Sequence, residues 1–238
     1  MRDLSDGQIF EGVSFDLHRG EILGIYALIG AGRTDVALTL FGAKKRRAGE
    51  VWLRGQACDI RSPAEAVRLG LGLVPEDRKG QGLVMSMVSS ANMTLSMIER
   101  LSSRSFVRRR AERDLVEMYR DKLRMQAHVP AQEARTLSGG TQQKVVLAKM
   151  LACNADVILF DEPTRGIDVG AKNEIYELMV QLCDEGKAIL MISSEMPELL
   201  GMSDRILVMR EGRLNGEFMR GEATEERLLQ AASKSRQQ

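Results

Sequence analysis

The sequence is poor in cysteine, and its few cysteines are not grouped. Cys58, Cys153 and Cys183 are scattered along 238 residues without a CxxC pair. Closely spaced cysteines are needed for a disulfide framework or a thiolate zinc site, so this spacing argues against both. We therefore expect ordinary free cysteines in a protein of a reducing compartment.

Long apolar runs are also missing. The longest candidate, residues 22–31, is interrupted by glycines, and it is much shorter than the ~20 residues that span a bilayer. The first eight residues, MRDLSDGQ, contain no apolar core of a secretory signal. We therefore expect no transmembrane segment and no secretory leader, and we expect any membrane role to be peripheral.

An excess of charge of either sign is absent, because 34 Lys and Arg residues balance 33 Asp and Glu residues. No whole-chain field therefore favours nucleic acid or an acidic membrane surface. Arginines at 104, 108, 109, 110 and 113 form a basic group, but acidic residues alternate with them between 112 and 121. We interpret this segment as a solvated helix face.

Two β-like runs and a glycine turn open the chain. Apolar residues in 12–28 lie on both sides of Arg19-Gly20, which predicts two strands, the second of them buried. The turn IGAGRTD follows, and apolar residues at helical spacing predict a helix over 34–41 that ends at Gly42. Strand, glycine turn and helix in this order are what a phosphate-binding P-loop requires.

The rest of the chain predicts a mixed α/β protein with a helical insertion. Ser62-Pro63 is typical of a helix start, for a short helix that ends at Gly70. Residues 85–135 lack β-like runs, and residues 106–125 have helical apolar spacing. Alternating strands and helices then predict a mostly parallel sheet covered on both faces. The other expected elements are a hairpin at 50–60, a strand at 157–160, a helix at 169–183, a strand at 188–192, a hairpin at 206–218 and a disordered tail, ASKSRQQ, at 232–238.

Residues 137–168 carry the strongest chemical signal. In LSGGTQQ, Ser138, Gly139 and Gly140 expose backbone N–H groups at a helix start, where phosphate binds well. The apolar run VILF then ends in Asp161 and Glu162, as expected of a buried parallel strand that delivers carboxylates to the edge of a sheet. Half of a phosphate site and half of a metal and water site thus lie within about thirty residues.

These motifs resemble those of the ABC ATPases. LSGGTQQ, VILFDEP and GID follow one another in the order and spacing of that family's signature, Walker B and D-loop. The resemblance implies an α/β fold, with a P-loop NTPase (RecA-like) core of mostly parallel sheet, a small antiparallel β subdomain and an inserted α-helical subdomain. It implies one ABC ATPase domain over 1–238, with its core at 1–84 and 135–222, a helical subdomain at 85–134 and a C-terminal tail at 223–238.

The P-loop is present in altered form. A working loop reads GxxxxGK[ST], and the aligned residues here run from Ala27 to Thr34. Arg33 replaces the lysine, and its planar guanidinium is not an equivalent phosphate ligand. Ala27 would resist a left-handed backbone. The resemblance assigns nucleotide binding to Gly30, Ala31, Gly32, Arg33, Thr34 and Asp35.

The resemblance also assigns the metal and water chemistry. Thr34 and Asp161 match the magnesium ligands of the family. Glu162 matches the catalytic carboxylate that polarises the attacking water.

Two further positions depart from the family pattern, and a third agrees with it. Glu76 stands at the glutamine of the Q-loop, and Ser194 stands at the switch histidine. Asp168 matches the D-loop aspartate. The histidines of the chain, His18 and His128, lie elsewhere, and we expect them to be structural or surface residues.

Together, these features resemble the second, C-terminal ATPase half of bacterial importers for ribose, galactose, xylose and related sugars. The proteins of that family are about twice as long, so the chain is expected to be one separately expressed or truncated half. Their ATP lies between two halves, which implies that this signature serves ATP held by the partner half. The residues acting in this way are Leu137, Ser138, Gly139, Gly140 and Gln142.

The resemblance further implies ATP and Mg²⁺ as cofactors, and a cytoplasmic location, peripheral on the inner face of the bacterial cell membrane. The implied partners are a second ABC ATPase half, integral membrane permease subunits and, through the permease, a periplasmic sugar-binding protein, but no nucleic acid. Two alternatives stay open. The altered P-loop favours a catalytically inactive nucleotide-binding regulatory domain, whereas a non-transport ABC ATPase acting on DNA or ribosomes would need a coiled coil or basic arm that the sequence does not show.

Overall fold

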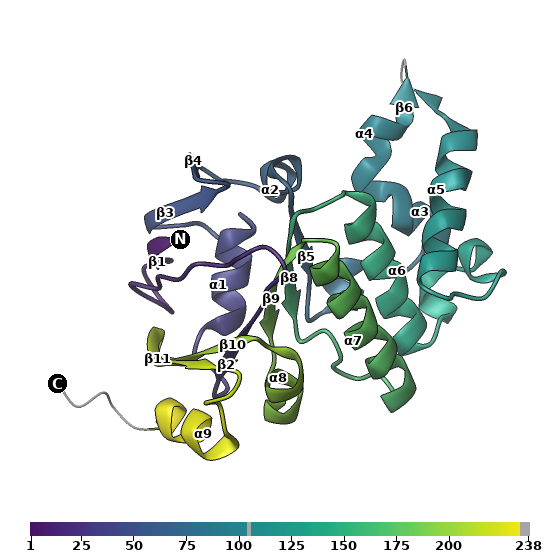
Figure 1. Ribbon diagram of the computed structural model, residues 1–238. Coiled ribbons are helices and arrows are strands. Elements are labelled where there is room, and N and C mark those ends of the chain that lie inside the picture. Colours follow the sequence, from purple (N-terminus) through teal and green to yellow (C-terminus); the bar gives the residue numbers. More distant parts are fainter. Residues whose placement is uncertain (104–105, 234–238) are drawn as a thin grey trace.

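A six-stranded sheet forms the centre of the computed structural model, which describes residues 1–103 and 106–233 (Figure 1). The strand order is β11-β10-β2-β9-β8-β5, and every neighbouring pair is parallel except β10 and β11, which form a hairpin. The mostly parallel sheet predicted from the sequence is confirmed. Its strands are β2 (Ile22–Ala27), β5 (Leu71–Val74), β8 (Val157–Asp161), β9 (Ala188–Ile192), β10 (Arg205–Arg210) and β11 (Arg213–Met219).

Alternate side chains of these strands enter two different hydrophobic cores. In β8, Phe160 packs into the core that holds helices α6 (Gly139–Ala152) and α7 (Val169–Asp184), whereas Leu159 packs into the core that holds α1 (Arg33–Leu40). Burial on both faces is the reason that the strands read as unbroken apolar runs.

A second sheet, antiparallel and of order β1-β3-β4, packs beyond α1. It consists of β1 (Arg2–Ser5), β3 (Ala48–Leu53) and β4 (Gln56–Cys58), so the predicted hairpin is present. The predicted strand before Arg19 is wrong, because only Val13 forms a β-bridge there, with Leu4. Val13 and Phe15 are nevertheless buried, which accounts for the alternating pattern that suggested a strand.

Two short helices lie at the ends of sheet strands. Helix α2 (Pro63–Leu69) begins and ends as predicted, since the Ser62 hydroxyl accepts the Glu65 N–H and Gly70 has a left-handed backbone. Helix α8 (Met196–Met202) follows β9.

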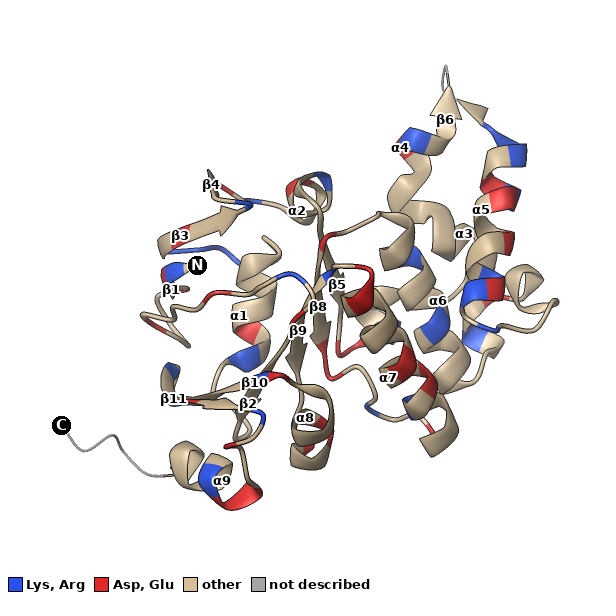
Figure 2. Cartoon of the chain, in the orientation of Figure 1, with Lys and Arg blue, Asp and Glu red and all other residues tan. Residues whose placement is uncertain are grey.

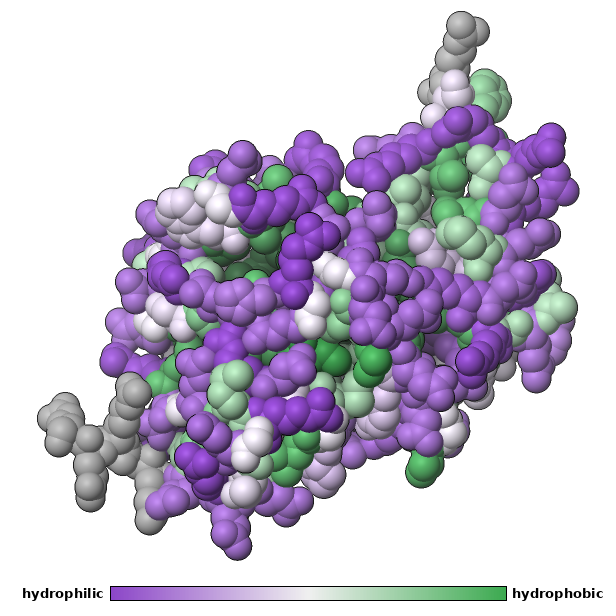
Figure 3. Space-filling view, viewed as in Figure 1, coloured by the Kyte–Doolittle hydropathy of each residue, from purple (hydrophilic) through white to green (hydrophobic). Residues whose placement is uncertain are grey.

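The insertion between β5 and α6 is mainly helical. It contains α3 (Ser89–Thr94), α4 (Ile98–Leu101) and α5 (Arg109–Lys122), with single 3₁₀ turns at Leu95–Met97, Val129–Ala131 and Ala134–Thr136. Hydrophobic side chains are visible in the opening between α4 and α5 (Figure 3).

Helix α5 is shorter than predicted, and a small hairpin precedes it. Strands β6 (Ser102–Ser103) and β7 (Phe106–Val107) pair with each other, so residues 106–108 do not join the helix. Within the segment of helical apolar spacing, Met118 is half exposed, whereas Val116 is buried. Basic and acidic residues alternate along α5 (Figure 2), and Arg109 pairs with Glu112. Position 104 of the arginine group lies outside the described residues.

The predicted tail contains a packed helix. Helix α9 (Glu225–Ser233) buries Leu228 and Ala232 against the main core, so the expectation of disorder from residue 232 is wrong for residues 232 and 233. Residues 234–238 lie outside the described part. None of the helices in the described ranges is long and apolar enough to cross a membrane.

Candidate nucleotide site

The glycine turn between β2 and α1 has the backbone of a phosphate loop. Gly30 and Gly32 have φ angles of 85° and 90°, and α1 begins directly after them. A Cβ atom on Gly32 would lie 2.9 Å from Ile9 Cγ2, so that position needs glycine for two reasons. Ala27, the last residue of β2, does not have a positive φ angle, and the strain expected there is absent.

The side chain of Arg33 folds inward across the end of the sheet. Its Nη1 atom donates to the Ala27 carbonyl at 2.6 Å, and its Nη2 atom lies 2.7 Å from Glu162 Oε1. Both side chains of this ion pair are largely buried, with 13% and 6% of their areas exposed. Arg33 is therefore already paired with a carboxylate of the chain itself.

Glu162 is held at both carboxylate oxygens. The second oxygen, Oε2, accepts a hydrogen bond of 3.2 Å from the Ser194 hydroxyl. The Glu162 backbone has a φ angle of 48°, in the left-handed region that is strained for a residue with a side chain, and its N–H donates to Ile192. Burial raises the pKa of Glu162, while Arg33 and Ser194 oppose that rise.

Thr34 and Asp161 form the part of the site suited to a metal. The Thr34 hydroxyl donates to Asp161 Oδ1 at 3.1 Å, and Asp161 is 2% exposed. Burial raises the pKa of Asp161 to about 6, although the Thr34 hydrogen bond acts in the opposite direction. In residues 1–103 and 106–233, no three or more His, Cys, Asp or Glu side chains gather as a metal cluster. A hydroxyl and one carboxylate nevertheless fit Mg²⁺, because this ion is usually bound by few protein oxygens together with water and the phosphates of its substrate.

The signature turn is built as a helix start. The Ser138 hydroxyl accepts the Thr141 N–H at 3.3 Å, and Ser138 is exposed. Gln142, predicted to act on a partner's nucleotide, is only 4% exposed and donates to the Ala134 carbonyl, so its side chain supports the turn from inside. Leu137 is partly buried against the core.

The other predicted site residues lie around these two centres. Asp35 pairs with Lys44, Glu76 pairs with Arg165, and the Asp168 carboxylate accepts the Ala171 N–H at the start of α7. His18 and His128 are exposed, as expected. The structure thus brings Arg33, Thr34, Asp161, Glu162 and Ser194 together and keeps Ser138 apart from their hydrogen-bond network.

Sequence inspection missed a buried carboxylate behind the switch position. Glu198 is 6% exposed and accepts hydrogen bonds from the hydroxyls of Thr164, Tyr176 and Ser193. These donors come from the turn after β8, from α7 and from the end of β9. A glutamate in the short helix α8 carries no sequence signal of this role.

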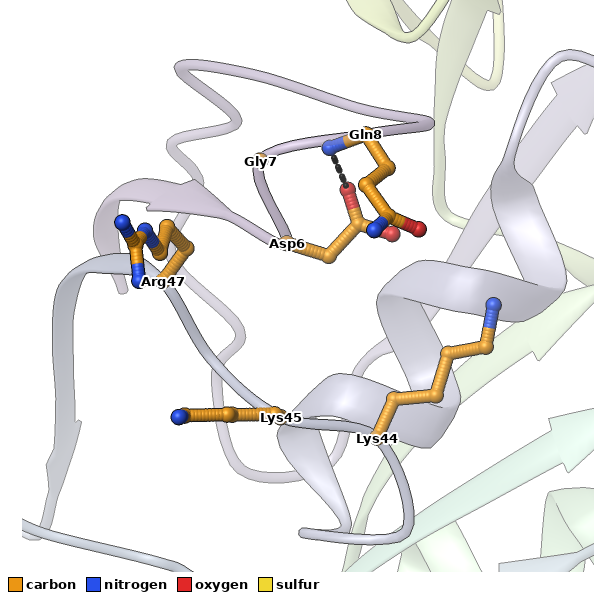
Figure 4. A pocket seen from close by; sticks show the side chains of 6 residues that line it. All are labelled: Asp6, Gly7, Gln8, Lys44, Lys45 and Arg47. Atoms are coloured by element: carbon orange, nitrogen blue, oxygen red, sulfur yellow. Dashed lines mark hydrogen bonds between the residues drawn. The ribbon is translucent and has the colours of Figure 1, made fainter.

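A hollow of about 480 Å³ beside α1 is lined by basic residues (Figure 4). Its basic side chains diverge, with Lys45 and Arg47 directed away from Lys44. The backbone N–H groups of residues 8, 9 and 10, which lie nearby, already donate to Asp6 Oδ1. The hollow therefore lacks converging donors for an anion.

The chain is similar in sequence to ATP-binding proteins of sugar importers. Residues 10–165 match the family model described as "ABC transporter". The chain is 51% identical over 234 residues to a putative ribose/galactose/methyl galactoside import ATP-binding protein of Burkholderia lata, covering 98% of this chain and 46% of the relative. It is 49% identical over 221 residues to the xylose import ATP-binding protein XylG of Pseudomonas syringae, covering 92% of this chain and 42% of the relative. The chain spans about half the length of the curated relatives it matches.

Solved structures show the same fold. A dimeric post-hydrolysis ATP-binding cassette, MJ0796 bound to ADP and Pi, has a TM-score of 0.79 at 20% identity, covering 92% of this chain and 98% of the other. A nucleotide-free cassette from an ABC transporter has a TM-score of 0.78 at 21% identity, covering 98% and 93%. At these identities the likeness concerns the fold, which agrees with the α/β class predicted from the sequence.

Proposed function

Since the chain belongs to the ABC transporter family, we propose that it is an ATP-binding half of a carbohydrate importer that lends its signature turn to a partner half's ATP. The names of the sugar-import relatives support the substrate class. The contrast between the signature turn and the chain's own nucleotide site supports the proposal that the first serves a partner half and the second is weak. Ser138 is exposed at an intact helix start, whereas Arg33 and Glu162 are paired with each other inside the chain's own site.

The signature turn would act on ATP held by a partner half's P-loop. The N–H groups at the start of α6 are donors for a γ-phosphate, and such preorganised donors stabilise charge that develops in phosphoryl transfer. Leu137 supports this turn from the core. Gly139 and Gly140 pack closely inside the chain, because a Cβ atom there would lie 3.0 Å from Arg78 Nη2 and 2.9 Å from Ala171 Cβ, respectively. Asp168 begins α7 at the neighbouring D-loop.

The chain's own site would bind ATP and Mg²⁺ weakly. Thr34 and Asp161 would hold Mg²⁺, which supplies charge neutralisation at the phosphates. Glu162 would polarise the attacking water, but its carboxylate is held by Arg33 and Ser194. Hydrolysis by this site is therefore slow in the proposed mechanism, although its acidic residues are complete.

An apolar groove offers a place for the permease. It has a volume of about 860 Å³ and lies between α2, residues 95–100 and α6. The helical segment 85–134, which we propose as a subdomain, forms one wall, and the loop after Glu76 forms another. We propose that permease subunits dock here from the membrane, which would place the chain on the cytoplasmic face, and that a periplasmic sugar-binding protein acts through the permease.

The Arg33–Glu162 pair also favours a second candidate, a catalytically silent nucleotide-binding domain. One experiment separates the two. ATP turnover is measured for the chain alone, for a partner half with an intact P-loop, and for the two together, with Ser138→Arg as the test variant and Ser103→Arg, an exposed serine of β6, as its control.

The expected result is little turnover by the chain alone, a strong gain on mixing, and loss of that gain with Ser138→Arg only. Turnover on the order of 1 per second or more by the chain alone would contradict the weak own site. No effect of Ser138→Arg would contradict the signature role and favour the silent domain.

A further inference from the structure

A single π-helical turn, Arg78–Gly82, follows β5 and stands beside the signature helix. The Asp77 carboxylate caps it by accepting the N–H groups of Lys79 and Gly80, at 3.2 and 3.0 Å. Such turns are rare, and they occur often at functional sites because they present side chains at an unusual angle. The segment has no role in the site described above.

Arg78 joins the turn at residues 165–166 to the signature helix α6. Its Nη1 atom donates to the Arg165 carbonyl at 2.9 Å, and its Nη2 atom donates to the Gly166 carbonyl at 3.3 Å. Its Nε atom lies 3.4 Å from Gln142 Oε1, and Gln142 in turn donates to the Ala134 carbonyl at 3.0 Å. A planar fork with several donors can satisfy such divergent acceptors, whereas an ammonium group cannot span them.

The signature backbone packs directly against this guanidinium. A Cβ atom on Gly139 would lie 3.0 Å from Arg78 Nη2 and 3.0 Å from the Gly166 carbonyl oxygen. Position 139 therefore has no room for a side chain, because Arg78 lies on one side of it and the turn at Gly166 on the other. The position of Arg78 sets the spacing between these two turns.

The π turn is also fixed at its other end. The Lys149 ammonium donates to the Gly82 carbonyl at 3.0 Å, and a Cβ atom on Gly82 would lie 2.9 Å from Val146 Cγ2. Gln142, Val146 and Lys149 lie on one face of α6, at the spacing of successive helical turns. Arg78 is thus held on a rigid support along the signature helix. Glu76, just before the turn, pairs with Arg165 and adds a second link to the same segment.

We propose that Arg78 is a positioning residue, which holds the signature turn 138–140 and the turn at Gly166 at the spacing needed to act together on a partner half's ATP. This inference rests on the proposed function. Arg78 touches no nucleotide in this scheme. It acts through the backbone of residues 139 and 165–166, so its loss should change the rate of the chemical step more than the binding of ATP.

The test measures kcat and KM for ATP in the assembly of this chain with an intact partner half. Arg78→Gln should lower kcat at least tenfold and change KM less than threefold, because the partner's P-loop still binds ATP. Arg78→Lys should restore only part of kcat, since it keeps the charge and loses the fork. Lys79→Gln, an exposed neighbour in the same π turn, is the matched control and should behave as the unaltered protein.

Melting temperatures of all variants accompany the kinetics. A kcat for Arg78→Gln within twofold of the unaltered value would overturn the inference, as would full rescue by Arg78→Lys. If Arg78→Gln fails to fold, the comparison of Arg78→Lys with Lys79→Gln decides the same question. Ser138→Arg is measured in the same assay. If Ser138→Arg leaves turnover unchanged, the proposed function fails. If Ser138→Arg abolishes turnover but Arg78→Gln does not change it, only this inference is overturned.

Discussion

The guanidinium of Arg33 and the carboxylate of Glu162 form an ion pair of 2.7 Å inside the chain's own nucleotide site. These are the two groups that a P-loop and a Walker B strand would direct toward a γ-phosphate and its attacking water. In this chain each neutralises the other, and Ser194 holds the remaining carboxylate oxygen. The weak nucleotide binding that we propose for this site would thus have a physical cause beyond the bulk of arginine, because a phosphate would have to compete with Glu162 for Arg33.

Arg33→Lys should therefore strengthen ATP binding to the chain. A lysine keeps the charge but lacks the two separate nitrogens with which Arg33 reaches Ala27 and Glu162, so we expect it to be held less firmly and to be more available to a phosphate. We expect at least a tenfold lower Kd for MgATP, which corresponds to about 1.4 kcal/mol. Calorimetric titration of the chain checks this. Arg61→Lys, an exposed arginine paired with Asp59, is the control. An unchanged Kd for Arg33→Lys would remove the ion pair as the cause of weak binding.

The buried Asp161 should make the metal-free protein less stable as the pH rises. Its pKa is raised to about 6 by burial, above the value near 4 of an unfolded chain. Between these values the folded state binds more protons at Asp161 than the unfolded state does, so the contribution of Asp161 to stability is greatest below pH 4 and is lost as the pH rises through 6. Asp161→Asn keeps the acceptor for Thr34 and removes the charge.

Urea unfolding in buffer with a chelator measures this effect. Asp161→Asn should be more stable than the unaltered protein at pH 7.5, by roughly 2–3 kcal/mol, and the difference should shrink at pH 4.5. The same difference at both pH values would show that packing, and not ionisation, is responsible.

Helix α9 should contribute to the stability of the whole domain. Leu228 is fully buried against the main core, while its neighbour Leu229 is 46% exposed. Leu228→Ala should lower the free energy of unfolding by about 2–4 kcal/mol, because it leaves a cavity. Leu229→Ala, the matched control, should cost less than about 1 kcal/mol. Equal small losses in urea unfolding would indicate that α9 is only loosely attached.

The sequence predicted the elements whose signals are local. Apolar runs marked the buried strands β8 and β9, and the cap at Ser62 marked α2, because burial and capping act within a few residues. The tail helix was missed because its packing depends on a distant sheet. The link from Arg33 to Glu162 joins residues 129 positions apart, and no spacing rule contains the direction of a side chain. Motifs therefore predicted the candidate site, and only the structure revealed the pairing of Arg33 with Glu162 inside it.

Ser194→His should restore little by itself, although the family pattern has histidine at this position. The Ser194 hydroxyl donates to Glu162 Oε2, but Oε1 remains bound to Arg33, so the carboxylate stays held after the serine is lost. The double variant Arg33→Lys/Ser194→His removes both restraints. Because the two side chains act on one carboxylate, their effects should not add.

We expect the double variant of the isolated chain to hydrolyse ATP at least tenfold faster than the product of the two single effects predicts, in a steady-state phosphate-release assay. Adding Glu162→Gln to the double variant should abolish this gain, because the water-polarising carboxylate is then missing. If the two single effects simply multiply, then Glu162 is not the group through which Arg33 and Ser194 limit the site.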